Sequence, residues 1–195
     1  MTTHSLILDG IWARPRRWEP LRRALESSVG PAEIFEYDSS GMKKFEFLAT
    51  QLIDRIRAID APVNLIGFSM GGLVIRTACM LAPDLSVRRA AFLNTPHGGS
   101  ILAWLAPFGG VRELRPGSEL LCKLKDQPWT IPTLVIWNPL DTAVIPGRNT
   151  RWDIPTVTET ICSVPLHVWP IFSSKFREQI VSFVADDSIA SVIPG

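Results

Sequence analysis

The stretch GFSMGG, residues 67–72, sets a serine between glycines at the spacing G-x-S-x-G. The apolar run VNLI precedes it and a segment of helical periodicity follows it, and this strand–turn–helix context is what gives the spacing meaning. On such a turn the hydroxyl of Ser69 would project from the carboxyl edge of a sheet, beside the free N–H groups of the next helix. The pattern indicates nucleophilic catalysis; the alternative is a serine that only caps the helix.

A serine hydroxyl is a weak nucleophile, so it needs a base that a third group orients. The sequence contains three histidines. His167 lies between the last predicted strand and the last predicted helix, at the carboxyl edge, and is the predicted base. His97 follows a strand at the same edge and is its rival, whereas His4 precedes the first strand and falls at the opposite edge.

Asp141 follows the apolar run PTLVIWN by a few residues and is the predicted orienting acid. It could instead be a turn aspartate bonded to its own backbone, which is common after Asn and Pro. The chain order of Ser69, Asp141 and His167 favours the catalytic interpretation, because serine, acid, histidine is the order in which this triad is built on an α/β sheet.

These residues need a sheet to bring them together, and the hydrophobic pattern predicts one. Short apolar runs alternate with stretches of helical period, which indicates an α/β protein with a mainly parallel sheet of about six strands and helices on both faces. The predicted strands are 5–10, 32–37, 63–68, 89–95, 132–138 and 158–164. Helices are predicted around 18–25, 45–59, 70–82 and 176–184, and the long connection 96–130 is expected to hold one or two short helices.

Composition and charge limit the classes of function. The 195 residues suit one domain, and 46% hydrophobic with 20% charged residues is ordinary globular usage. Lys and Arg number 20 against 19 Asp and Glu, and the resulting net charge of +1 provides no global field for nucleic acid. We therefore expect no nucleic-acid partner, and the oligomeric state is left open.

The cysteines, the amino terminus and the longest apolar segment indicate the cellular compartment. Cys79, Cys122 and Cys162 are odd in number and widely spaced, so they predict neither a disulfide framework nor a zinc site. The amino terminus lacks the basic start and apolar stretch of a secretory signal. The longest mainly apolar segment, 101–111, is shorter than the roughly 20 residues of a spanning helix. These features predict a cytoplasmic protein without a transmembrane segment.

The ordered set of motifs resembles the α/β-hydrolase superfamily, and within it the small bacterial lipases and esterases. The resemblance is carried by DGIW, GFSMGG, NTPHGGS, LRPGSELL, the aspartate of PLDTAVIP and the histidine before the final helix. It implies a minimal α/β-hydrolase fold over residues 1–195, with a small lid-like or cap segment within about 100–126. It also implies hydrolysis of a carboxylic ester or lipid through an acyl-serine on Ser69, with no metal or organic cofactor.

Two other functions stay open beside this one. A thioesterase or acyltransferase would use the same three residues with a different leaving group or acceptor. Outside enzymes, the alternative is a protein of this fold that binds a ligand without turning it over.

The family also implies two backbone donors for the oxyanion. One is the N–H of the residue after the nucleophile, here Met70, and the other comes from the loop after the first strand, here Ile11. Relatives usually have His-Gly where this chain has Asp9-Gly10. Because a carboxylate facing a developing oxyanion would be repulsive, we expect Asp9 to point away and to brace the loop through backbone hydrogen bonds.

Aromatic residues near the predicted carboxyl edge indicate an aromatic-lined substrate pocket, although core filling is the alternative for each tryptophan. The candidates are Trp12, Phe68, His97, Trp104, Phe108 and Trp169. Five arginines also cluster around the start of the first helix: Arg14, Arg16, Arg17, Arg22 and Arg23. Such a run is usually a solvated face; the second interpretation is that it attracts anionic substrates such as acyl carriers or phospholipid head groups.

Overall fold

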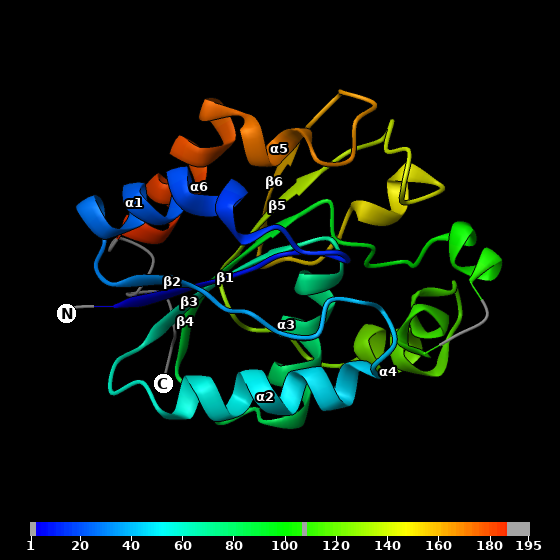
Figure 1. Cartoon of the computed structure of the whole chain (residues 1–195), viewed down its shortest axis with the longest axis horizontal. Coiled ribbons are helices and arrows are strands. Elements are labelled where there is room, and N and C mark those ends of the chain that lie inside the picture. Colours follow the sequence, from blue (N-terminus) through cyan, green and yellow to red (C-terminus); the bar gives the residue numbers. More distant parts are fainter. Residues whose placement is uncertain (1–2, 107–108, 187–195) are drawn as a thin grey trace.

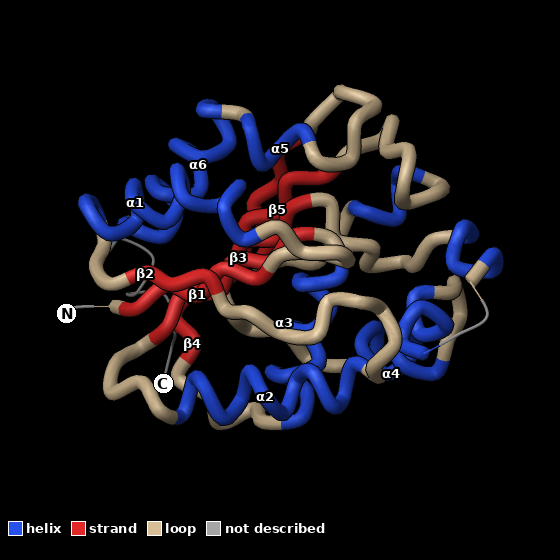
Figure 2. Tube along the Cα trace, in the orientation of Figure 1, coloured by secondary structure: helices blue, strands red, loops and turns tan. Residues whose placement is uncertain are grey.

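The computed structural model describes residues 3–106 and 109–186, and its centre is a six-stranded sheet (Figure 2). All neighbouring strands run parallel, in the order β2-β1-β3-β4-β5-β6. The strands are β1 (His4–Leu8), β2 (Ala32–Ile34), β3 (Val63–Phe68), β4 (Val87–Leu93), β5 (Thr133–Trp137) and β6 (Val157–Ile161). The first residue of each strand lies within two residues of the first residue of a predicted strand. The predicted α/β class and number of strands are therefore confirmed.

The central strands are apolar throughout because both faces of the sheet are covered. Successive side chains on a strand point to opposite faces. Leu65 therefore packs with the core on one face and Ile66 with the core on the other, and Phe92 and Leu93 divide in the same way. The near-continuous hydrophobic runs in the sequence are the consequence.

Helices cover both faces, as the sequence predicts (Figure 1). One face carries α2 (Phe45–Arg57), α3 (Met70–Leu81) and α4 (Glu119–Asp126), and the other carries α1 (Glu19–Ser28), α5 (Trp169–Phe172) and α6 (Ser174–Ala185). The stripe of Phe176, Ile180 and Val184 on α6 is buried, as its spacing predicts. Ile59 lies beyond the end of α2, which is shorter than its hydrophobic pattern suggested.

The described part of the connection between β4 and β5 holds three short helical segments, where one or two were expected: η2 (Ile101–Leu105), η3 (Gly109–Leu114) and α4. Ser118 caps α4, since its hydroxyl accepts a hydrogen bond from the Leu121 amide. Two further turns of 3-10 helix are η1 (Pro15–Trp18), just before α1, and η4 (Gly147–Thr150), after β5. Within the described ranges no helix has the length and apolar character that crossing a bilayer requires.

Candidate active site

Ser69 occupies a strained turn between the end of β3 and the start of α3. Its backbone angles are φ 51° and ψ −122°, a region that residues other than glycine rarely adopt. Strain of this kind is characteristic of functional sites, where the surrounding structure holds it in place. Both elements that flank Ser69 are fully packed, so the turn has no room to relax.

The glycines on either side of Ser69 are required by close packing. A Cβ at Gly67 would lie 2.6 Å from the Cα of Gly72, and one at Gly71 would lie 2.5 Å from the carbonyl oxygen of Asp9. Neither position has space for a side chain. The turn is therefore pressed against the carboxyl end of β1, where the loop that carries Ile11 begins.

Asp141 and His167 form a hydrogen-bonded pair. The distance from Nδ1 of His167 to Oδ2 of Asp141 is 2.6 Å, and the Asp141 side chain is fully buried. The second carboxylate oxygen of Asp141 accepts hydrogen bonds from the amides of Ala143 and Val144, each at 2.8 Å. The carboxylate is thus fixed by its own loop, and the imidazole is oriented through Nδ1.

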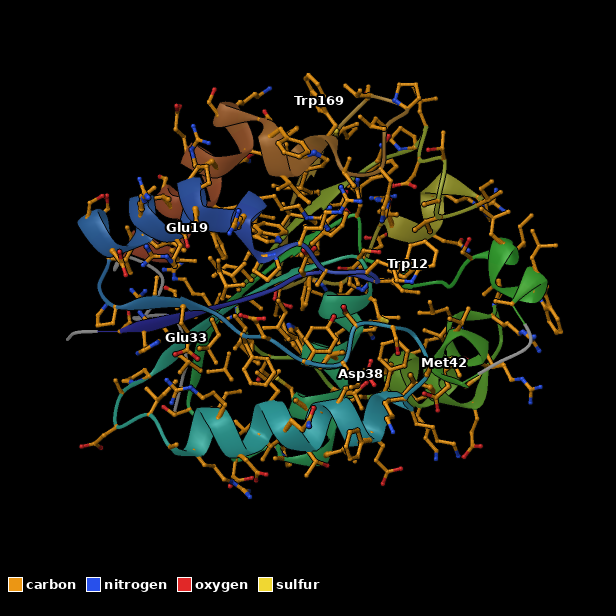
Figure 3. All side chains as sticks on the ribbon, in the orientation of Figure 1. Trp12, Glu19, Glu33, Asp38, Met42 and Trp169 are labelled. Carbon is orange, nitrogen blue, oxygen red and sulfur yellow. The ribbon has the colours of Figure 1, made fainter. Side chains whose placement is uncertain are left out.

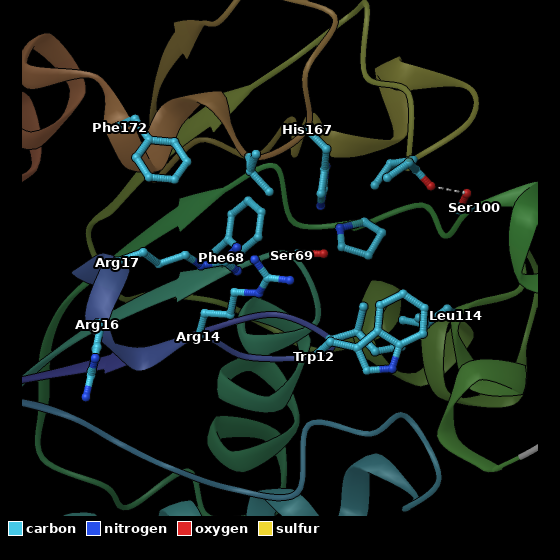
Figure 4. A pocket seen from close by; sticks show the side chains of 15 residues that line it. Trp12, Arg14, Arg16, Arg17, Phe68, Ser69, Ser100, Leu114, His167 and Phe172 are labelled. Atoms are coloured by element: carbon cyan, nitrogen blue, oxygen red, sulfur yellow. Dashed lines mark hydrogen bonds between the residues drawn. The ribbon is translucent and has the colours of Figure 1, made fainter.

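Ser69 and His167 line the same cavity, whose volume is about 740 Å³. In Figure 4 the imidazole of His167 extends toward the hydroxyl of Ser69. The ring of Phe68 packs against the imidazole, with 4.8 Å between the ring centroids. Because Nδ1 is bonded to Asp141, the nitrogen that faces Ser69 is Nε2.

Two asparagines at strand ends hold the loop that carries His167. Asn94, directly after β4, donates its side-chain amide to the carbonyl of His167 at 2.7 Å. Asn138, directly after β5, donates to the carbonyl of Val164 at 2.6 Å. Sequence analysis did not identify either residue, although a polar side chain directly after a buried strand was the available signal.

Ile11 and Met70, the two residues whose amides the sequence suggests as oxyanion donors, both lie close to Ser69: Met70 follows it in the chain, and Ile11 lines the same cavity. Met70 begins α3, where helix geometry leaves its N–H without an intrahelical acceptor, and Ile11 lines the cavity. In the part of the chain that the structure describes, neither amide donates to another protein acceptor. The next residue, Trp12, has a φ of 54° and donates its N–H to the carbonyl of Ser39 at 2.8 Å, which fixes the loop.

Asp9 faces away from the cavity and braces the same loop. Its carboxylate accepts hydrogen bonds from the amides of Gly10 at 2.7 Å and Arg14 at 2.8 Å. It also forms an ion pair with the guanidinium of Arg17. The Tyr37 hydroxyl donates to the Asp9 carbonyl, and burial raises the pKa of that phenol above its usual range, so it remains a donor. This is the orientation that the repulsion argument predicts.

Comparison with known proteins identifies the fold. No protein-family model matches the chain, and no curated protein sequence matches it significantly. Solved structures do match.

A monoacylglycerol lipase of Paleococcus ferrophilus aligns over 93% of both chains with a TM-score of 0.69 and 14% identity. An esterase of Exiguobacterium antarcticum aligns over 94% of this chain and 92% of its own, with a TM-score of 0.68 and 14% identity. A mature Bacillus licheniformis lipase covers 91% of each chain at a TM-score of 0.66 and 18% identity.

The chain has the α/β-hydrolase fold. In this α/β-hydrolase fold the loops after β3, β5 and β6 carry Ser69, Asp141 and His167, and all three emerge at the carboxyl edge of the sheet. Ligands of open parallel sheets bind at that edge. His4 begins β1 and lies at the other edge, as its place in the sequence predicts.

Among the described residues, two of the aromatic side chains that the sequence suggested line the cavity, Trp12 and Phe68. Trp104 does not line it, because it is exposed on η2 and stacks under the guanidinium of Arg115 at 4.5 Å. Trp169 does not line it either, since its side chain points outward from the start of α5 (Figure 3). Phe108 lies outside the described residues.

His97 was wrongly expected at the pocket. It is buried on the α3 side of the sheet, where its ring stacks on Trp152 with centroids 4.8 Å apart. Its Nδ1 lies 3.2 Å from Nη1 of Arg76. Burial, followed by the charge of Arg76, holds the pKa of His97 well below its ordinary value, so the imidazole is neutral. It belongs to the core and is not a base for Ser69.

Several pocket residues had no clear signal in the sequence. Phe172 lines the cavity from the far end of α5, less than one helical turn after Trp169. The other lining residues that were not anticipated are small or aliphatic: Pro96, Ser100, Leu114, Ala143, Val144 and Val168. Among the described residues no group of three or more His, Cys, Asp or Glu side chains converges as a metal site would require.

Proposed function

We propose that the protein is a serine carboxylesterase or lipase that hydrolyses carboxylic esters through an acyl-serine intermediate. The observation that carries the proposal is the hydrogen-bonded Asp141–His167 pair, whose free imidazole nitrogen faces Ser69 in the main cavity. A nucleophile, a base and an orienting acid in this relation are the signature of triad hydrolases on unrelated folds.

The first half of the reaction acylates Ser69. Its Oγ attacks the ester carbonyl while Nε2 of His167 takes the hydroxyl proton, and Asp141 stabilises the imidazolium that results. The negative charge on the carbonyl oxygen is held by the amides of Ile11 and Met70, and each such donor is typically worth about 10²- to 10³-fold in rate. When the carbonyl re-forms, the ester C–O bond breaks and His167 passes its proton to the leaving alcohol.

The second half returns the enzyme to its starting state. A water molecule attacks the acyl carbonyl and gives a proton to Nε2 of His167. The same amides hold the second oxyanion. Collapse releases the carboxylic acid, and the proton returns from His167 to the oxygen of Ser69.

The cavity walls suit an ester of modest size. Its volume of about 740 Å³ lies within the usual range for small-molecule sites, and its lining combines Ser69 and His167 with aliphatic and aromatic side chains. Two residues of the segment 100–126 form part of that lining: Ser100, which caps η2, and Leu114, which ends η3. We propose that this segment is a small cap on a single hydrolase domain.

Labelling with a fluorophosphonate probe tests the proposal. The wild-type protein should be modified at Ser69, and Ser69→Ala should not react. Ser27→Ala, which removes an exposed hydroxyl on α1, is the matched control and should be labelled like the wild type. A wild-type protein that does not react, or equal labelling of Ser69→Ala, would contradict the mechanism.

A substrate panel separates the related activities. p-Nitrophenyl esters of increasing acyl length, together with a matched thioester, report on chain-length preference and leaving group. Faster turnover of the oxygen esters supports an esterase, whereas a strong preference for the thioester would replace it with a thioesterase.

A further inference from the structure

The cavity around Ser69 has an unbalanced charge. Three arginines line it, Arg14, Arg16 and Arg17, and no aspartate or glutamate is among its lining residues. One of the three is already neutralised, because Arg17 pairs with the buried carboxylate of Asp9. The cavity therefore keeps two guanidinium charges although the whole chain carries a net charge of only +1.

Arg14 and Arg16 differ from the arginines that follow them. On α1, Arg22 pairs with Glu19 and Glu26, and Arg23 pairs with Glu19. In the described part of the chain no carboxylate lies within 4.0 Å of the Arg14 or Arg16 guanidinium. The sequence showed a run of basic residues, and the structure divides it into a compensated part on the helix and an uncompensated part at the cavity.

Arg14 is the better placed of the two. Its backbone amide is fixed by Asp9 at 2.8 Å, three residues after the loop residue Ile11. Figure 4 shows its side chain extending toward the centre of the view, where Ser69 and Phe68 are drawn, whereas the guanidinium of Arg16 is directed away. Arg14 and Ser69 line one cavity, so a group bound by Arg14 would share that cavity with Ser69.

We propose that the substrate is an ester that carries a carboxylate or phosphate group, and that Arg14 binds this anion. The proposal rests on the esterase function above and names its substrate class. A guanidinium presents a planar pair of donors that matches both anions, and hydrogen bonds between charged partners are stronger than neutral ones. The side chain of Arg14 is exposed to solvent at the cavity, so its attraction for a bound anion should weaken as the ionic strength rises.

The selectivity between two matched esters tests the proposal. Mono-p-nitrophenyl adipate and p-nitrophenyl hexanoate have acyl chains of equal length, and only the first ends in a carboxylate. In the wild type, kcat/KM should favour the adipate ester, and this preference should decrease as ionic strength rises. Arg14→Gln should lower the adipate-to-hexanoate ratio about tenfold, mainly through the KM for adipate.

Two variants control the comparison. Arg14→Lys keeps the charge without the planar donor pair and should recover part of the ratio. Arg23→Gln removes a charge from the exposed face of α1 and should leave the ratio unchanged. If Arg14→Gln lowers kcat/KM equally for both esters, the proposal is overturned. Arg14 would then support the oxyanion or the fold in general.

A binding measurement shows whether the site prefers a phosphate or a carboxylate, and it does not require turnover. Decyl phosphate and decanoate, each below its micelle concentration, are titrated into Ser69→Ala by calorimetry, with decanol as the neutral reference. Each anion should bind more tightly than decanol, and Arg14→Gln in this background should weaken the tighter of the two anions about tenfold. The tighter anion identifies the source as phosphate or carboxylate.

The two proposals can fail separately. Hydrolysis of the hexanoate ester with no preference for adipate, and equal binding of anions and decanol, would overturn the anion site and leave the esterase standing. Tight anion binding that depends on Arg14, in a protein that no fluorophosphonate labels, would overturn the esterase and leave the anion site.

Discussion

The carboxylate of Asp141 approaches Nδ1 of His167 to 2.6 Å, and its other oxygen is held by two amides of its own loop. The carboxylate is thus held by its own loop through one oxygen and bonded to the imidazole through the other. A carboxylate with this set of partners controls both the tautomer of the histidine and the direction in which its ring points.

Replacing Asp141 with Asn should lower kcat by about 10³-fold or more, because an amide cannot stabilise the imidazolium and can enforce the wrong tautomer. The fold should persist, since Asn can still accept from the Ala143 and Val144 amides. Far-UV circular dichroism and p-nitrophenyl ester kinetics measure the two effects. Asp153→Asn, which alters a carboxylate whose side chain is 82% exposed, serves as control and should retain normal kcat. Near-normal turnover in Asp141→Asn would assign the orienting role to another carboxylate.

Replacing Asp9 with Asn should destabilise the protein by about 2–3 kcal/mol, because Arg17 would keep a largely buried charge without its partner. Urea unfolding measures the change. Adding Arg17→Met to the variant should recover part of the loss, since the unpaired charge is then removed. Glu26→Gln breaks a more exposed pair with Arg22 and should cost less than about 1 kcal/mol. Equal costs at the two sites would mean that Asp9 is not a structural brace.

The strain at Ser69 predicts an unusual order of stabilities. Ser69→Gly should be more stable than Ser69→Ala by about 1 kcal/mol, because glycine adopts a positive φ without strain and alanine does not. The same pair of substitutions at Ser27, within α1, should show the opposite order, since glycine disfavours a helix. Chemical denaturation of the four variants provides the comparison. The same order at both positions would argue against backbone strain at residue 69.

The neutral, buried His97 predicts a loss of stability in acid. Its pKa in the folded state is held well below the ordinary value of 6.5, while the unfolded chain takes up a proton near that value. The unfolded state therefore binds more protons below about pH 6.5, and this one group should lower the unfolding free energy by up to about 1.4 kcal/mol per pH unit as the pH falls. Urea unfolding at several pH values measures the slope.

His97→Gln should be less stable than the wild type near neutral pH, since it loses the ring stack on Trp152, but its stability should fall less steeply in acid. The two unfolding curves should therefore approach one another as the pH decreases. Parallel curves would show that His97 does not take part in the acid response.

The parts of the fold that were predictable are those that local pattern determines. Runs such as VNLIGF are apolar because both faces of the sheet are buried, so they identify strands without knowledge of the tertiary structure. The grouping of Ser69, Asp141 and His167 followed in turn, since parallel strands bring their carboxyl ends to one edge. Chain order and sheet topology were sufficient to bring them together.

The pocket walls were less predictable, because side-chain direction depends on tertiary contacts. Trp169 and Phe172 belong to one short helix, yet only Phe172 faces the cavity. Trp104 lies in an apolar segment, but Arg115 covers one side of its ring. His97 has the polarity of a site residue, and its burial beside Arg76 follows from contacts that no local pattern encodes.

The attachment of the His167 loop to Asn94 and Asn138 separates two properties of the molecule. The loop of His167, the proposed base, is held by side chains at strand ends, whereas the segments around Leu114 and Phe172 line the cavity and carry none of the proposed catalytic groups. Loops from other proteins of this architecture could therefore be grafted at those two places one at a time. Each graft would change which substrates fit the cavity, while Ser69, Asp141 and His167 would keep their positions after the strands.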